Sequence, residues 1–118
     1  MRVYVAMGWA GGGWEVSGTE GGGLVYRRLG HDGNVLAEKE LSPSPEAWRG
    51  FRERLAELGV HRWEARYEPE YPVCGGTAWA VRLEDEEGRL ESTGEDAYPP
   101  NWEGFLRALG ELAGRELG

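Results

Sequence analysis

The chain has 118 residues, the length of one ordinary domain, and each half would be marginally stable alone. Its formal net charge of −8 disfavours nucleic acid or an anionic membrane as a partner, because both require clustered lysines and arginines. The single cysteine, Cys74, cannot form an internal disulfide, and no apolar run approaches the roughly 20 residues of a membrane span, so we expect a cytoplasmic protein. Lys39 is the only lysine among 13 basic residues, a bias that resembles GC-rich thermophiles.

In the first half of the chain, the pattern predicts strands joined by glycine-rich turns. Residues 8–23 contain eight glycines and are expected to form a long connection. Asp32-Gly33 is a strong signal for a hairpin turn. The expected strands are residues 3–7, a short segment around 14–16, and residues 24–29 and 35–40.

A helix is expected after this hairpin. Ser44 is its predicted N-cap and Pro45 its first residue, because a hydroxyl accepts from a free backbone N–H and proline needs no intrahelical partner there. The helix should end near Leu58, before Gly59, a residue that favours the left-handed conformation after a helix.

The second half is expected to follow the same order. Residues 61–67 alternate between apolar and charged side chains, which predicts a strand with one face toward water. Further strands are expected at about 79–83 and 89–93, and the acidic run 84–87 between them predicts a solvated hairpin tip. A second helix is expected at roughly 102–117.

One pattern occurs twice, 54 residues apart in the chain. Trp48–Phe51 (Trp-Arg-Gly-Phe) corresponds to Trp102–Phe105 (Trp-Glu-Gly-Phe), and leucines follow both at matching spacings. Internal repetition predicts two copies of one structural unit. We therefore expect one domain, residues 1–118, made of two pseudo-symmetric units of about 1–59 and 60–118.

These elements predict the fold class and the placement of one tryptophan in each helix. Each helix has a single apolar stripe, so it buries one face against a sheet. We expect an α+β fold: a two-layer, tandem βββα repeat with a mostly antiparallel sheet of about six strands and two helices on one face. Trp48 and Trp102 should then occupy matching places, each packed against the sheet.

Part of the second half resembles a family of small uncharacterised bacterial proteins. Residues 75–81 and 92–99, followed by Trp102, are similar to a pattern in which an (Asp)-Gly-x-x-Trp-x-(aliphatic) strand leads to a Ser-x-Gly-Ser-Asn-x-Tyr-Pro turn before the last helix. The resemblance covers about residues 72–109 and implies an intact domain, without an assigned activity. The chain departs from the pattern where Asp, Ser and Asn are expected, at Gly75, Glu95 and Asp96.

Several motifs suggest chemistry but lack the residues that it requires. Met7–Gly13 follows a strand, as a phosphate-binding loop does, but no helix N-terminus comes after the glycines. Cys74 would need a histidine beside it to act as a nucleophile, whereas His31 is expected at a hairpin tip and His61 on the interior face of a strand. The spacing of these three residues is not that of metal ligands, so we expect no metal and no cofactor.

Two groups of residues remain as candidate binding sites. Glu95, Asp96 and Tyr98 lie between a strand and a helix, where two carboxylates could act as acid and base, or Asp96 could hold a turn. Trp9 and Trp14 lie in the glycine-rich connection, outside every predicted core face, and exposed tryptophans often make interface contacts. The alternative is that both fold back over the end of the sheet.

The sequence favours a non-catalytic binding or protein-interaction module with an unknown ligand, functioning through the glycine-rich connection and the helix-free face of the sheet. A homodimer or another protein is the expected partner. The alternative is a small, hydrolase-like enzyme with an acidic cleft near Glu95, Asp96 and Tyr98.

Overall fold

The structure is a computed structural model that describes residues 1–71 and 76–117. This part of the chain forms one seven-stranded sheet, two α-helices and two short 3-10 helices. In chain order the elements are β1 (Arg2–Trp9), β2 (Gly12–Gly18), η1 (Glu20–Gly22), β3 (Leu24–Leu29), β4 (Val35–Leu41), α1 (Pro45–Leu58), η2 (Val60–Arg62), β5 (Arg66–Tyr67), β6 (Ala78–Asp85), β7 (Gly88–Glu95) and α2 (Trp102–Ala113). The expected α+β class and mostly antiparallel sheet are confirmed, with seven strands in place of about six.

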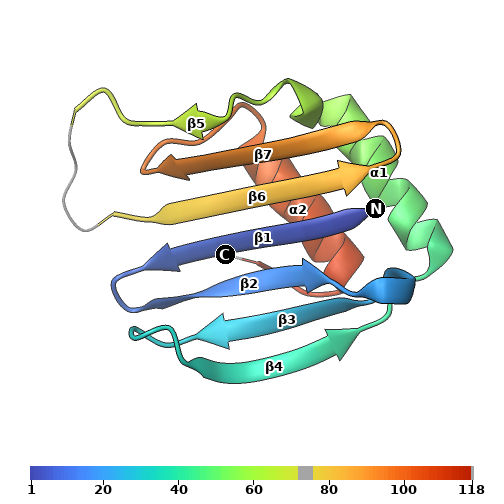
Figure 1. Cartoon of the computed structure of the whole chain (residues 1–118), viewed down its shortest axis with the longest axis horizontal. Coiled ribbons are helices and arrows are strands. Elements are labelled where there is room, and N and C mark those ends of the chain that lie inside the picture. The colour runs from blue at the N-terminus through green and yellow to red at the C-terminus, as the bar shows by residue number, and fades with distance from the viewer. Residues whose placement is uncertain (72–75, 118) are drawn as a thin grey trace.

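The strands follow the order β4-β3-β2-β1-β6-β7-β5 across the sheet. All neighbours are antiparallel except β5 and β7, which are parallel. Both α-helices lie behind the sheet in Figure 1, with α2 crossing the central strands and α1 beside it. The opposite face of the sheet, turned toward the viewer, carries no helix and is called here the helix-free face.

The glycine-rich segment after β1 is a strand and a tight turn, so the expected long connection is wrong. Trp9 pairs with Gly12, which leaves only Ala10 and Gly11 in the turn. Glycine is required in β2 because a Cβ on Gly13 would collide with the carbonyl oxygen of Met7. The strand β2 then runs as far as Gly18, well beyond the short segment expected around residues 14–16.

The second half starts differently from the expected strand at residues 61–67. His61 is exposed in η2 instead of lying on an interior strand face. Only β5 is extended as a strand, and it joins the sheet beside β7 rather than β6. The buried hydroxyl of Ser92 donates to the carbonyl of Glu64 at 2.6 Å and anchors the segment before β5. The strand connections of the two halves therefore differ.

The helix ends follow local chemistry, with one correction. Ser44 caps α1, accepting from the backbone N–H of Ala47 at 3.0 Å, and Gly59 ends the helix with φ of 70°. The second helix ends at Ala113, not near Leu117, because Gly114 adopts φ of 72° and the N–H of Arg115 donates to the carbonyl of Gly110. None of the described helices has both the length and the apolar character needed to cross a membrane.

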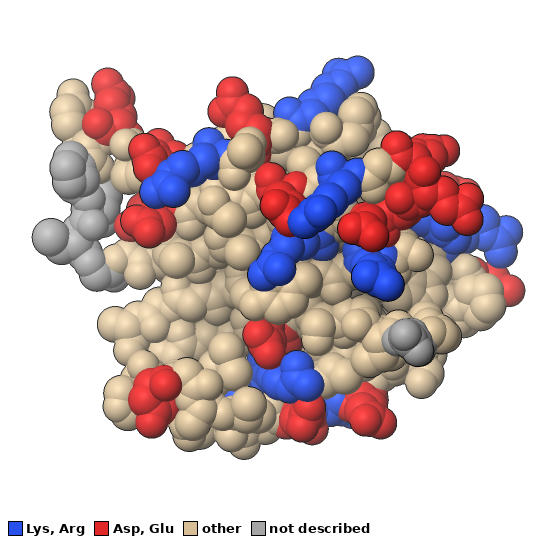
Figure 2. Space-filling view, in the orientation of Figure 1, with Lys and Arg blue, Asp and Glu red and all other residues tan. Residues whose placement is uncertain are grey.

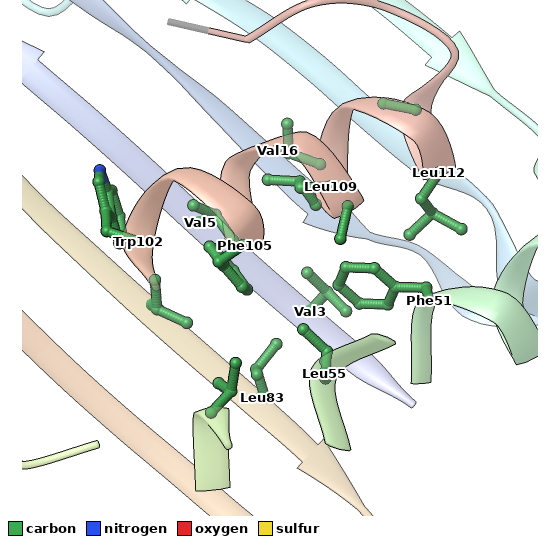
Figure 3. Close-up of a cluster of buried hydrophobic side chains, with 14 of the residues drawn as sticks. Val3, Val5, Val16, Phe51, Leu55, Leu83, Trp102, Phe105, Leu109 and Leu112 are labelled. Atoms are coloured by element: carbon green, nitrogen blue, oxygen red, sulfur yellow. The ribbon is translucent and has the colours of Figure 1, made fainter. Parts of the chain in front are cut away.

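The core lies between the sheet and the two helices. Val3, Val5 and Val16 of the central strands contact the helical layer, in which Phe105 is fully buried (Figure 3). An aromatic cluster fills the end of this core below β6 and β7, and its rings lie about 4.6 to 6.5 Å from their neighbours. Its members are Trp63, Tyr67, Trp79, Tyr98, Trp102 and Phe105.

Candidate functional site

The helix-free face has a charged part and an uncharged part. Figure 2 shows acidic and basic side chains over β6 and β7 and again over β2 to β4, with a tan area without charge between them toward the left. The register places Ala6, Gly8, Ala78 and Ala80 side by side on the uncharged part. It places Arg2, Arg82, Glu84, Arg89 and Glu91 on the charged part.

A row of polar contacts crosses five strands of this face. Arg82 of β6 lies over the ring of Tyr4, with its guanidinium carbon 4.6 Å from the ring centroid. The Tyr4 hydroxyl donates to Glu15 at 3.3 Å, and Glu15 also accepts from Arg27 at 3.3 Å. Burial of Tyr4, and then the nearby Glu15 carboxylate, raise the pKa of the Tyr4 hydroxyl above its ordinary value. Arg27 continues the row to Glu38 of β4 at 2.9 Å.

A hollow begins at the charged end of this face. It has a volume of about 960 Å³ and continues around the N-terminal end of β1 toward the first turns of α1. Its charged lining comes from four elements: Arg2 of β1, Arg52 of α1, Arg82 and Glu84 of β6, and Arg89 and Glu91 of β7. We call this hollow the arginine cleft.

Three of the four arginines in the cleft are available to a ligand. Arg89 is paired with Glu91. In the described part of the chain, Arg2, Arg52 and Arg82 make no ion pair within 4 Å. Guanidinium groups bind carboxylate and phosphate oxygens through two parallel N–H donors, so a cleft with three such groups is suited to an anion.

Two aromatic side chains also line the arginine cleft. Trp48 of α1 is half-buried, and its Nε1 donates to the carbonyl oxygen of Gly22 at 2.7 Å, which fixes the ring beside η1. Tyr4 supplies the second ring, with Arg82 stacked over it. The ring contact holds Arg82 in place without neutralising its charge.

The arginine cleft could not be predicted from the sequence. The alternation of Arg82 with Glu84, and of Arg89 with Glu91, is visible in the sequence and indicates two water-facing strand faces. Nothing in the spacing shows that Arg2 and Arg52 lie near these faces, since they come from other elements. The strand order brings Arg2, Arg82 and Arg89 to one end of the sheet, and the packing of α1 adds Arg52.

Asp96, one of the predicted site residues, holds a turn. Its Oδ1 accepts from the N–H of Thr77 at 2.8 Å, and its own N–H donates to the carbonyl of Thr77 at 2.9 Å. Its backbone has φ of 52°, which aspartate tolerates better than most residues. Gly76 lies so close that any Cβ there would collide with the carboxylate. This bonding supports the structural alternative for Asp96.

The other two members of that group lie beside it without forming part of the arginine cleft. Glu95 is exposed at the end of β7. Tyr98 is 41% exposed and stacks on Trp79, with ring centroids 6.5 Å apart and planes 18° apart. Tyr98 therefore covers the rim of the buried aromatic cluster, at the opposite end of the sheet from the arginines.

The two tryptophans of the glycine-rich segment have different environments. Trp9 is 46% exposed at the turn between β1 and β2, where a partner can reach it. Trp14 is 4% exposed and belongs to the core, so its placement outside the core is wrong. The error follows from the missed strand, because in β2 Trp14 points to the same side as the buried Val16. Its Nε1 has no hydrogen-bond partner within the described residues.

The remaining candidates are the histidine and cysteine residues considered for nucleophilic catalysis or metal binding. His31 is exposed in the turn between β3 and β4. Cys74 lies outside the described residues. Among residues 1–71 and 76–117, no three histidine, cysteine or acidic side chains are grouped closely enough to hold a metal ion.

No protein-family model matches the chain, and no curated protein was found to be similar to it. The resemblance of residues 72–109 to a bacterial family therefore stays a prediction.

Proposed function

We propose that this chain is a non-catalytic binding module whose ligand presents one or more anionic groups to the arginine cleft. The observation that carries the proposal is the contrast in charge. The whole chain has a net charge of −8, yet its 960 Å³ cleft is lined by four arginines and two glutamates. Guanidinium groups gathered in one hollow produce a local positive potential on a protein whose surface is otherwise largely negative. This potential attracts anionic ligands to the cleft.

The contacts within the cleft support binding rather than catalysis. Arginine does not exchange protons near neutral pH, so Arg2, Arg52 and Arg82 can orient an anion but cannot serve as acid or base. The rings of Tyr4 and Trp48 add apolar area beside the charges, a combination that is typical of ligand pockets. The Asp96 carboxylate accepts a backbone hydrogen bond from Thr77 and holds a turn, which counts against the enzyme alternative.

Calorimetric titration tests this proposal with two probes, a hexaglutamate peptide and inorganic phosphate. Replacing Arg2 and Arg82 together with alanine should weaken binding of the preferred probe at least about tenfold, since each hydrogen bond to a charged group contributes roughly 1.5–3 kcal/mol. Arg107→Ala is the matched control: Arg107 is exposed on α2, away from the cleft, and is also without an ion pair in the described part of the chain.

The two probes separate the possible sources of the anion. Preference for hexaglutamate indicates an acidic protein segment, and preference for phosphate indicates a phosphorylated small molecule. If neither probe binds, or if the Arg2/Arg82 variant binds as tightly as the Arg107 variant, the proposed function is wrong.

We also propose that β3–β4–α1 and β6–β7–α2 are the two copies of a tandem repeat in a two-layer domain. Each is an antiparallel hairpin followed by a helix, and Phe51 and Phe105, which follow the repeated tryptophan at the same spacing, are both buried, with their rings 6.5 Å apart. Phe51→Leu and Phe105→Leu should then cost similar unfolding free energy, about 1 kcal/mol each for a modest change in volume. Urea melts that differ by more than about 2 kcal/mol between the two variants would contradict the correspondence.

A further inference from the structure

The hairpin between β6 and β7 carries a compact acidic tip. Residues 84–87 are four consecutive acidic residues, and β6 and β7 stay paired up to Asp85 and Gly88. The Asp85 carboxylate accepts from the N–H groups of Glu87 and Gly88, at 2.8 and 3.0 Å, so the turn is held in one conformation. Glu86 and Glu87 are exposed at its end.

The two glutamates of this tip are available for contacts. Neither makes an ion pair with another of the described residues. The tip is also pre-ordered by the turn, so little conformational entropy is lost when it binds. It is therefore a suitable acidic segment for a cleft of unpaired arginines.

The acidic tip and the arginine cleft are adjacent on the same molecule. Glu84, the first residue of the tip, and Arg89, which pairs with it across the hairpin, also line the cleft. Figure 2 shows this arrangement as red side chains immediately beside blue ones at the right of the helix-free face. The tip cannot fold back into its own cleft, because β6 and β7 stay paired without a register shift up to the two-residue turn.

We propose that the arginine cleft binds the acidic tip of a second copy of this chain, forming a twofold-symmetric dimer. A twofold interface needs two complementary surfaces close together, because each copy must offer both at once. The tip and the cleft satisfy this requirement. In the dimer, Glu86 and Glu87 of each copy lie against Arg2, Arg52 and Arg82 of the other. This inference rests on the proposed function, since it names the ligand of the same cleft.

Charge reversal of the tip distinguishes specific docking from general electrostatics. Glu86→Arg with Glu87→Arg adds two charges at each position and changes the net charge from −8 to −4. If general repulsion between chains controlled association, this change would strengthen it. Docking of the tip into the arginine cleft predicts the opposite, at least a tenfold weaker dimer, because arginines would then face arginines.

Sedimentation velocity in physiological salt measures the outcome directly. The wild-type chain should have about twice the 13.1 kDa mass of one copy, and the tip variant should sediment as a monomer. The variant Glu103→Arg with Glu111→Arg is the matched control: it makes the same change in charge on the exposed side of α2 and should remain a dimer. Circular dichroism spectra confirm that each variant is folded.

A complementary variant provides a rescue experiment. Arg2→Glu with Arg82→Glu should also be monomeric alone. Mixed with the tip variant, it should form a heterodimer, because both tip-to-cleft contacts then join opposite charges. A wild-type chain that is monomeric, a tip variant that remains dimeric, or a mixture that does not associate would each overturn the proposal.

The failure of this inference can be told apart from failure of the proposed function. The monomeric tip variant has an empty cleft, so it should bind hexaglutamate more tightly than the wild-type dimer does. A monomeric wild-type chain that binds hexaglutamate through Arg2 and Arg82 contradicts the dimer and supports the binding function. A dimer that dissociates on tip reversal, while the empty cleft binds neither hexaglutamate nor phosphate, contradicts the general anion-binding function instead.

Discussion

The helices α1 and α2 carry the same Trp-x-Gly-Phe pattern but have different roles in the structure. In α2, seven residues are buried, including Trp102, Phe105 and Leu109, whereas in α1 only Phe51 and Leu55 are buried. The reason is position: α2 crosses the central strands of the sheet, and α1 packs beside it (Figure 1). Equivalent residues in a repeated sequence can therefore have unequal environments, because burial depends on which part of the sheet each copy covers.

The two tryptophans show this difference most clearly. Trp102 is the first residue of α2 and is 8% exposed, with its ring 4.6 Å from that of Trp79 and 5.9 Å from that of Trp63. Trp48 is in the fourth position of α1, half-buried, and contacts Phe51 edge-on at 6.1 Å. The expectation that both occupy matching places on the sheet is wrong, because α1 begins three residues before its tryptophan and α2 begins at its own.

The largest predicted effect comes from replacing these tryptophans. Trp102→Ala should lower the free energy of unfolding by about 3–5 kcal/mol, the usual loss for a buried large aromatic residue. Trp48→Ala should cost roughly 1–2 kcal/mol, the sum of one hydrogen bond to Gly22 and a partly buried ring. Urea melts followed by circular dichroism measure both values.

A matched variant separates the two contributions at Trp48. Trp48→Phe keeps most of the ring area but removes the donor to Gly22, so it should recover part of the loss seen with alanine. Equal losses for Trp48→Ala and Trp102→Ala would break the comparison and would mean that α1 contributes as much buried area as α2.

The parts of the fold that follow from local chemistry were predictable from the sequence. Ser44 and Gly59 marked both ends of α1 because capping depends on residues next to each other in the chain. The acidic turn between β6 and β7 was predictable for the same reason. The strand β2 was not, because eight glycines between residues 8 and 23 indicate a loop unless close backbone approach to the neighbouring strands is known.

The candidate site was the least predictable part, because it depends on contacts between distant segments. The arginine cleft joins β1, α1, β6 and β7, and no local pattern links Arg2 with Arg52. The parallel pairing of β5 with β7 is also a long-range feature, because it joins residues 66–67 to residues 93–94. A strand of two residues is too short to show an alternating pattern in the sequence. Of the two tryptophans expected outside the core, Trp9 is exposed at the end of β1, whereas Trp14 is buried, because the loop in which it was expected is the strand β2.

The smallest predicted effect concerns the glycine that both helices carry after the tryptophan. Gly50 of α1 is exposed, and a Cβ built there would have no atom within 4 Å. Gly104 of α2 faces α1, and a Cβ there would lie 2.9 Å from Cδ2 of Leu58. Alanine is favoured over glycine within a helix by roughly 0.5–1 kcal/mol, because it has less backbone freedom to lose on folding.

Gly50→Ala should therefore raise the free energy of unfolding by about 0.5–1 kcal/mol. Gly104→Ala should give a smaller gain or a loss, since the side chain of Leu58 must move and the packing of the two helices must adjust. Chemical denaturation of both variants in parallel measures the difference, and circular dichroism checks that neither loses helix. A larger gain for Gly104→Ala than for Gly50→Ala would show that α2 does not pack against Leu58 at this glycine. That result would contradict the contrast between α2 as the central helix and α1 as the flanking helix at the contact between them.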